Sequence, residues 1–423
     1  MRPDTVPPLV GRIGVSPNGP SFRLGTVRTH LAAAAFVVRA AGTLGADARL
    51  LVRIDDTNPA RARHEFEAPL LEELEQVARI PLGRLGTVQG APWVMRQSDR
   101  LSRYHEVAAS LRGSGLAETL EDGSTVVRVH GEQLTVTSET TGVTVRVLRA
   151  NGWPLWHFAS AIDDIDAGVG VCVRGIDKYS AEPVQRAIIH ALGGTAPSIY
   201  HLPKLVSADG GDRVQELLRT GLRPTTLFEY IASSLLRRNS GCTSFEQLSS
   251  AIRVHSDLRS TLQLDRRYLE KLDRQVSARP GVADQVADLL RYARLRGDTV
   301  TADYLVTHEV LTLLEAYPRP LDVHHRLVSA IAGDAFSPDV PPPQTRTAVS
   351  LLETSADAAY EHLMRSGISQ PEAHRALRWV LCGLSSGPDF RTLWEWHQRN
   401  GTLRDRLAAA SRTIVELTRG GTT

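Results

Sequence analysis

The segment GRIGVSPNGPSFRLGTVRT, residues 11–29, decides the fold of this 423-residue chain. It leads from a short apolar run at residues 9–14, through a loop rich in Gly and Pro, into a helical pattern over residues 25–44. A second short apolar run, typical of a buried parallel strand, follows at residues 48–54. The order strand, loop, helix, strand is a βαβ unit, which favours a doubly wound α/β domain. A helix N-terminus attracts anions, so we expect a nucleotide or carboxylate site at this loop.

The α/β pattern continues beyond this unit and is interrupted once. Residues 64–79 and 99–113 have the spacing of amphipathic helices. Residues 124–149 instead alternate apolar and polar positions and are rich in Val and Thr, which predicts two or three antiparallel strands. The α/β pattern returns at residues 169–176. We therefore predict an α/β domain that carries a small β insert.

The second half of the chain has a helical pattern from about residue 213 onward. A Pro-rich stretch, SPDVPPPQT at residues 337–345, separates two helical regions. The predicted domains are an α/β domain at residues 1–210 with its insert at about 115–150, a helical region at 211–336 and a helical bundle at 337–423.

Composition excludes several classes of protein. The 42% apolar and 23% charged fractions are those of a globular protein, and no apolar run approaches the roughly 18 residues of a membrane span. The N-terminus lacks the layout of a secretory signal, so we expect a cytoplasmic protein without a membrane partner. The three cysteines form no C-x-x-C pair, which argues against a disulfide framework or structural zinc. A net charge of +2 still permits a local basic surface that binds nucleic acid.

Seven segments, in order along the chain, resemble signatures of the glutamyl-tRNA synthetases, which are class I aminoacyl-tRNA synthetases. Arg12, Ser16, Pro17 and Gly19 match the family's opening R-x-A-P-S-P-T-G, and residues 22–29 stand at its HIGH-type signature and following A-R-T. Residues 53–58 match the R-I-E-D-T-D strand end, and residues 97–100 the Q-S-x-R segment. The remaining similarities lie at residues 152–164, 173–193 and 376–407.

This resemblance implies a fold, a partner and a substrate. The fold would be a Rossmann-type class I catalytic domain with a small β insert, followed by all-α stem-contact and anticodon-binding-type helical domains. The partner would be tRNA, with tRNA(Glu) the family's own. The substrate would be glutamate or glutamyl-tRNA.

The resemblance also assigns a glutamate pocket. A glutamate brings two carboxylates, which bidentate Arg side chains bind, and an ammonium, which a buried acid binds. Arg12 and Arg174 would hold carboxylates, and Asp55 would hold the ammonium. We expect these three side chains to converge beneath loop 16–25. The residues implied for glutamate or the glutamyl end of charged tRNA are Arg12, Ser16, Asp55, Trp156, Ser160 and Arg174.

Two pocket residues depart from the family pattern. Asp55 stands where the family has Glu, one methylene longer, and Trp156 stands where it has Tyr. Trp156 keeps a flat wall but loses a hydroxyl. A structural interpretation of the same residues also stays open, in which Arg12 and Arg53 pair only with Asp55, Asp56 or nearby acids.

The family's ATP-handling signatures are degenerate. The implied catalytic positions are Arg23, Gly25 and Thr26, with Arg23 and Thr26 in place of the two histidines, and the implied ATP-binding positions are Gly19, Gly25 and Asp177. The KMSKS-type loop is deleted: His201-Leu202-Pro203 is followed by residues 207–213 and then directly by a helical pattern. No Lys lies between Lys204 and Lys271. We therefore predict a tight turn at residues 209–212.

Cofactor use follows from these losses. The family uses ATP with Mg²⁺, but fixed cationic donors stabilise the charge that develops on the phosphates, and several are missing here. This argues against efficient ATP use. His157 with Asp163 and Asp164 is a weak metal pattern, and the insert has no Cys, so we predict no metal and no zinc.

Three functions remain open at this stage. The first is a divergent protein that recognises tRNA(Glu) or glutamyl-tRNA, with adenylation impaired or lost, as in a biosynthetic enzyme that uses glutamyl-tRNA. The others are an active glutamate–tRNA ligase and a non-catalytic tRNA-binding regulator. In each of them, we expect Arg-rich helical segments to form an RNA-facing surface; these are Arg237–Arg238, Arg266–Arg267, Arg291–Arg296 and Arg404–Arg406.

Overall fold

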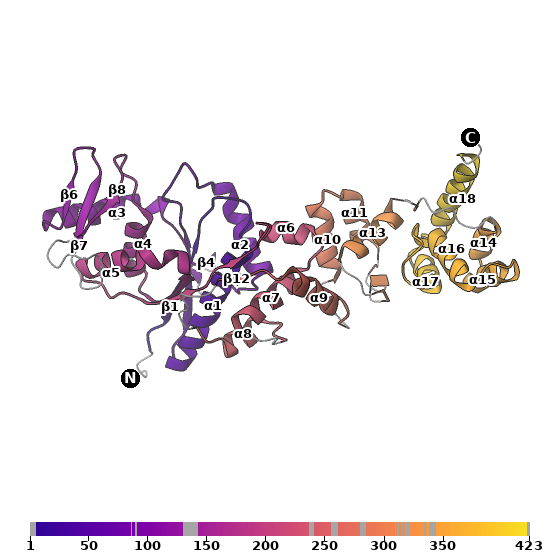
Figure 1. Cartoon of the computed structure of the whole chain (residues 1–423), viewed down its shortest axis with the longest axis horizontal. Helices are drawn as coiled ribbons and strands as arrows, with labels where there is room; N and C mark the ends of the chain where they lie inside the picture. Colours follow the sequence, from indigo (N-terminus) through magenta and orange to yellow (C-terminus); the bar gives the residue numbers. More distant parts are fainter. Residues whose placement is uncertain are drawn as a thin grey trace. The chain divides into compact units, whose positions relative to one another are not determined.

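The computed structural model describes residues 6–85, 87–88, 91–129, 143–236, 241–254, 261–279, 285–308, 310, 313–314, 316–317, 321–333, 336–337 and 344–420. The chain divides into two compact units. The first comprises residues 1–216 and 227–265, and the second residues 217–226 and 266–423. Figure 1 traces the helices and strands of the chain, coloured along the sequence. Arg237 and Arg238 lie outside the described residues.

The first unit is built on a five-stranded sheet in which every pair is parallel, in the order β10-β9-β1-β2-β5. The strands are β1 (Leu9–Val15), β2 (Ala48–Ile54), β5 (Val94–Arg96), β9 (Val169–Gly175) and β10 (Ser198–Leu202). The strand order reverses at β1, and in doubly wound sheets a ligand binds beyond the carboxyl ends of the strands at such a reversal. The predicted α/β class is confirmed.

Helix α1 (Leu24–Leu44) follows β1 and packs closely on the sheet because both surfaces carry small residues. Its residues from Ala32 to Ala35 are buried, and a Cβ atom at Gly11 of β1 would lie 2.9 Å from Val37 Cβ. The helix ends at Gly45, whose φ of 65° favours glycine. The other helices of the α/β pattern are α2 (Glu67–Gln76), α3 (Leu101–Gly113), α4 (Trp156–Asp166) and α5 (Glu182–Ala191).

The predicted β insert is a three-stranded antiparallel sheet. Its strands are β6 (Ala117–Thr119), β7 (Thr125–Val129) and β8 (Val143–Leu148). Its apolar face shares a core with α3, α4 and α5, in which Tyr104, Val127, Val147 and Phe158 are fully buried. The insert thereby supports α4, which carries several site residues.

The chain then passes through β11 (Leu205–Val206), which pairs in parallel with β12 (Leu262–Gln263). The helices along this stretch are α6 (Val214–Arg219), α7 (Pro224–Leu236) and α8 (Phe245–Ala251). Two short strands, β3 (Thr87–Val88) and β4 (Ala91–Pro92), form a separate antiparallel pair.

In its described residues, the second unit is helical apart from connections. Its helices are α9 (Arg266–Ser277), α10 (Gln285–Leu295), α11 (Thr299–Thr307), α13 (Leu321–Ala332), α14 (Thr345–Leu352), α15 (Ala356–Arg365), α16 (Gln370–Cys382), α17 (Phe390–Asn400) and α18 (Leu403–Gly420). One apolar core contains residues from Leu289 to Ile414 and includes Trp379 and Trp396. No helix in the described ranges has both the length and the apolar character that a membrane crossing needs.

One arginine of the expected RNA-facing surface is wrong, because it is buried in the second unit. Arg406 is buried, and its guanidinium donates from Nε to Val380 O at 3.1 Å and from Nη1 to Ala330 O at 3.2 Å. Arg267, Arg294 and Arg404 are exposed. Arg406 therefore stabilises the helical core, while the exposed arginines are still available to a polyanion.

Candidate active site

A cleft of about 990 Å³ opens at the carboxyl ends of β1, β2 and β9. It is lined by every site residue that the sequence indicated, except Ser160. These lining residues are Arg12, Ser16, Gly19, Arg23, Gly25, Thr26, Asp55, Trp156, Arg174 and Asp177. Ser160 is fully buried on α4, behind the cleft wall, at 3.4 Å from Arg12 Nη2. Residues from four separate segments thus meet at the place that the parallel sheet dictates.

Arg12, at the centre of β1, is held by an acid from α4. Its Nε lies 2.5 Å from Asp164 Oδ1 and its Nη2 lies 3.1 Å from Asp164 Oδ2. Burial works against the charged guanidinium, but the Asp164 carboxylate outweighs it, and the pKa of Arg12 is raised. The side chain is therefore a fixed cation with one edge occupied.

Asp55 sits at the end of β2 with both carboxylate oxygens engaged. Oδ1 accepts from Arg53 Nε at 2.6 Å, and Oδ2 accepts from the Trp156 indole Nε1 at 2.7 Å. The carboxylate lies over Gly14, where a Cβ atom would approach to 2.7 Å. Arg53 is fully buried and also reaches Asp164 Oδ1 at 3.3 Å. Arg53 thus pairs with nearby acids, as the structural interpretation of these residues expects. An ammonium bound at Asp55 would share the carboxylate with Arg53 and Trp156.

Arg174, on β9, is less well satisfied. Its Nε donates to His201 Nε2 at 3.1 Å and its Nη1 to Gln185 Oε1 at 2.5 Å, but its buried Nη2 has no hydrogen-bond partner among the described residues. Glu182 Oε2 lies 3.7 Å from Nη2, which makes an ion pair but no hydrogen bond. Burial lowers the pKa of Arg174. A guanidinium that lines a cleft with an unsatisfied donor is suited to binding a carboxylate.

The two degenerate signatures are joined to each other. Arg23 Nη1 lies 2.7 Å from Asp212 Oδ1, and the backbone N–H of Leu24 donates to Asp212 O at 2.8 Å. The N–H of Val214 donates to Phe22 O at 2.9 Å. Between β11 and α6 the chain turns over residues 207–210, which overlaps the predicted turn at 209–212; the Gly210 N–H donates to Ser207 O at 3.3 Å, and Gly210 has a φ of 75°. Hydrogen bonds thus join residues 212–214 to residues 22–24.

The degenerate HIGH-type motif by itself offers little charge to the phosphates of a nucleoside triphosphate. Asp212 is buried and neutralises Arg23, the one charged group of the degenerate HIGH-type motif. At Gly25 a Cβ atom would lie 2.6 Å from Leu205 O, so the side of this glycine that a side chain would occupy is filled by β11. Asp177, in the 3₁₀ helix Ile176–Ala181, lies 3.4 Å from Lys178 Nζ.

Sequence reasoning missed several contributors to the cleft. Lys178 Nζ lies 5.0 Å from the centre of the Trp156 ring, a cation–π contact. His30, on α1, lines the cleft, and in the described part of the chain its buried Nε2 has no hydrogen-bond partner. Burial lowers the pKa of His30 to about 4, against the opposing field of Asp55. The sequence does indicate His30, because it is a polar residue one helical turn after Thr26 in a largely apolar helical segment.

The weak metal pattern is dispersed. His157 Nε2 lies 2.8 Å from Arg146 O, whereas Asp163 accepts from Gln97, Arg100 and Tyr104. Across the part of the chain that the structure describes, no three His, Cys, Asp or Glu side chains are arranged to hold a metal ion.

Comparisons with known proteins agree with this geometry. Residues 9–122 match the family model for the catalytic domain of class I tRNA synthetases (E and Q). Glutamate–tRNA ligase 2 of Granulibacter bethesdensis is 26% identical over 325 residues, which cover 62% of this chain and 68% of the relative. Glutamate–tRNA ligase 1 of Rubrobacter xylanophilus is 29% identical over 246 residues, which cover 53% of each chain.

A solved structure extends the similarity of fold. The glutamate tRNA ligase from Elizabethkingia meningosepticum aligns with a TM-score of 0.59 at 17% identity, covering 96% of this chain and 99% of that one. The chain thus spans between 53% and 68% of the length of the two curated relatives named above, and nearly all of the solved structure. The family model and these relatives thus support a member of the glutamyl-tRNA synthetase family of class I synthetases, and the solved structure shows the same fold.

Proposed function

We propose that this protein recognises tRNA, with tRNA(Glu) as the first candidate, and holds glutamate or the glutamyl end of charged tRNA in its cleft. In this proposal it forms glutamyl-adenylate poorly or not at all. The observation that carries the proposal is the ion pair between Arg23 and Asp212, at 2.7 Å. It puts a buried carboxylate where the family needs cationic donors.

The amino-acid half of the cleft supports recognition of a glutamyl group. Arg174 offers an unsatisfied guanidinium nitrogen, and Arg12 is a fixed cation on the adjacent strand. Asp55 supplies a carboxylate whose position is set by Arg53 and Trp156. Two cations and one anion match the two carboxylates and one ammonium of glutamate.

The nucleotide half of the cleft argues against adenylation. Attack of a carboxylate on the α-phosphate concentrates negative charge, which preorganised donors must stabilise. Losing one such donor costs on the order of 10²–10³ in rate, and the losses in a shared network do not add simply. With Arg23 neutralised and the lysine-bearing loop deleted, we expect at least a ~10⁴-fold loss.

Pyrophosphate exchange tests the proposal. Glutamate-dependent ATP–pyrophosphate exchange is measured with and without tRNA, beside an intact glutamate–tRNA ligase. Exchange at the rate of the intact enzyme contradicts loss of adenylation and supports the second candidate, an active ligase in which Arg213 and Lys204 compensate, since both line the cleft. Absence of exchange, together with tighter binding of glutamyl-tRNA than of uncharged tRNA, supports the proposal. A regulator that only binds tRNA would instead bind glutamyl-tRNA and uncharged tRNA equally well.

A further inference from the structure

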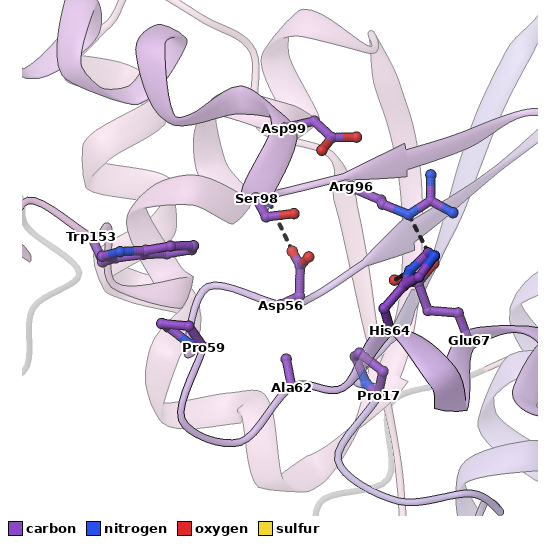
Figure 2. A pocket seen from close by; sticks show the side chains of 10 residues that line it. All are labelled: Pro17, Asp56, Pro59, Ala62, His64, Glu67, Arg96, Ser98, Asp99 and Trp153. Atoms are coloured by element: carbon purple, nitrogen blue, oxygen red, sulfur yellow. Dashed lines mark hydrogen bonds and ion pairs between the residues drawn. The ribbon is translucent and has the colours of Figure 1, made fainter.

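Charged side chains line two hollows of the first unit, and the two differ in how well their buried groups are satisfied. In the smaller hollow, of about 560 Å³, the buried Glu67 carboxylate lies 2.8 Å from Arg96 Nε and 2.9 Å from His64 Nδ1 (Figure 2). None of the described residues that line it has a buried polar side-chain atom without a hydrogen-bond partner. In the cleft, by contrast, the buried Nη2 of Arg174 has no such partner within the described chain. The contacts that hold Arg174 therefore decide what this donor can bind.

His201 is the neighbour of Arg174 in the sheet. The two residues are register partners on the parallel strands β9 and β10, and their side chains meet on one face. Arg174 donates from Nε to His201 Nε2 at 3.1 Å and from Nη1 to Gln185 Oε1 at 2.5 Å. Both acceptor residues are only 2% exposed, and neither lines the cleft. They can therefore act on a ligand only through Arg174.

The contact with Arg174 fixes the tautomer of His201. A guanidinium only donates hydrogen bonds, so His201 Nε2 must be the acceptor, and the proton of the neutral ring is then on Nδ1. Burial lowers the pKa of His201, and the charge of Arg174 lowers it further, so the ring is neutral at pH 7 and above. Nδ1 lies 3.5 Å from Glu182 Oε2. The imidazole thus contacts Arg174 with one nitrogen and faces Glu182 with the other.

Glu182 competes with a ligand for Arg174. Its Oε1 lies 2.7 Å from Arg186 Nε, and its Oε2 lies 3.7 Å from Arg174 Nη2, too far for a hydrogen bond. Without an acceptor at His201, the buried Nε of Arg174 would lose its partner, which is costly. A turn of the guanidinium toward Glu182 would recover a hydrogen bond. That turn would also occupy Nη2, the donor that a ligand carboxylate needs.

We propose that His201 is a positioning residue: by accepting the Arg174 Nε–H, it keeps Arg174 Nη2 available for the carboxylate of the glutamyl group. This inference rests on the proposed function, in which Arg174 binds that carboxylate. Preference for glutamyl-tRNA over uncharged tRNA then depends on a hydrogen-bond acceptor at position 201, and the imidazole ring itself is not needed.

A matched pair of variants of the full-length protein tests the role of His201. His201→Gln supplies an amide oxygen that can accept from Arg174, whereas His201→Leu supplies no acceptor. The control is His190→Leu, because His190 is exposed on α5 and does not line the cleft. Filter binding gives the dissociation constants for glutamyl-tRNA(Glu) and uncharged tRNA(Glu), and their ratio is the preference. The same substitutions are repeated in the Arg174→Gln background.

We expect His201→Gln and His190→Leu to keep the parent's preference, and folded His201→Leu to lose at least ~10-fold of it, the scale of one hydrogen bond to a charged group. Affinity for uncharged tRNA should not change. In the Arg174→Gln background, His201→Leu should cause no further loss, because it acts through Arg174. An unchanged preference in His201→Leu, or a further loss in that background, overturns the positioning role.

The tautomer of His201 gives a second test that does not depend on a variant that folds. In protein labelled with ¹⁵N-histidine, the ring of His201 is assigned by its proximity to Tyr179, whose ring centre lies 5.2 Å away. Nitrogen NMR at pH 8 should show the proton on Nδ1. A proton on Nε2 overturns the positioning role. A parent protein that binds glutamyl-tRNA no more tightly than uncharged tRNA overturns the proposed function instead.

Discussion

Arg23 and Asp212 form an ion pair at 2.7 Å, although 189 positions separate them in the chain. The pair joins the two segments to which the resemblance assigns the handling of ATP. Backbone hydrogen bonds join the same segments: the N–H of Leu24 donates to Asp212 O, and the N–H of Val214 donates to Phe22 O. Residues 22–24 and 212–214 therefore form one connected surface.

Replacing Asp212 tests this relationship. Asp212→Asn keeps an oxygen for Arg23 but removes the negative charge from the nucleotide half of the cleft. We expect ATP to bind at least ~3-fold more tightly, because the Arg23 cation is no longer neutralised. Equilibrium titration with ATP measures it, and Asp209→Asn on the exposed turn is the control. Equal or weaker binding would show that the pair does not limit phosphate binding.

Arg174 should select the charged form of tRNA. Arg174→Gln removes the guanidinium with the unsatisfied Nη2. We expect glutamyl-tRNA to lose about 2–5 kcal/mol of binding free energy, the cost of breaking a buried charged pair, while uncharged tRNA is little affected. Filter binding of both forms measures the difference, with Arg186→Gln, which does not line the cleft, as control. A parallel loss for both tRNAs would argue against the carboxylate role.

Binding of tRNA should depend steeply on salt. Exposed arginines such as Arg267, Arg294 and Arg404 can neutralise phosphates and release counterions. We expect micromolar or tighter affinity at low salt and at least a ~100-fold loss between about 50 and 200 mM salt. A fluorescence titration at several salt concentrations, with duplex DNA for comparison, measures it. Equally tight binding of duplex DNA would contradict the prediction that tRNA is the partner.

His30 should make the first unit sensitive to acid. Its pKa is lowered by burial from 6.5 to about 4, so the folded state binds its proton less readily than the unfolded state. The contribution of neutral His30 to the free energy of unfolding is therefore complete above pH 6.5 and is lost as the pH falls toward 4. At pH 5 the loss is about 2 kcal/mol.

In His30→Phe, which keeps a ring beside Phe22, this loss should disappear. Urea unfolding at pH 8 and pH 5 measures the difference between parent and variant. Other buried histidines, such as His397, are common to both proteins and cancel. An identical pH dependence in the two proteins would contradict a neutral, buried His30.

Local patterns in the chain predict the sheet and the insert well. The βαβ order around residues 11–29 depends on short apolar runs and on loop residues, and both are properties of neighbouring positions. The alternation at residues 124–149 likewise indicates antiparallel pairing, which β7 and β8 bear out. The resemblance also predicts that Arg12, Asp55 and Arg174 converge on one pocket, and all three line the cleft.

Local sequence patterns do not predict which side chains pair across the fold. The hydrogen bond from Trp156 to Asp55 joins residues 101 positions apart, and the pairing of Arg12 with Asp164 joins residues 152 apart. Nothing local distinguishes Asp164 from Asp163 as the partner of Arg12, and no pattern shows that Arg406 is buried while Arg404 is exposed. By itself, then, the sequence determined the class of fold, the resemblance to a family and the segments that meet at the cleft. Only the tertiary structure decided which charge faces which, because the energy of a buried charge depends on neighbours that packing, not chain order, brings within a few ångströms.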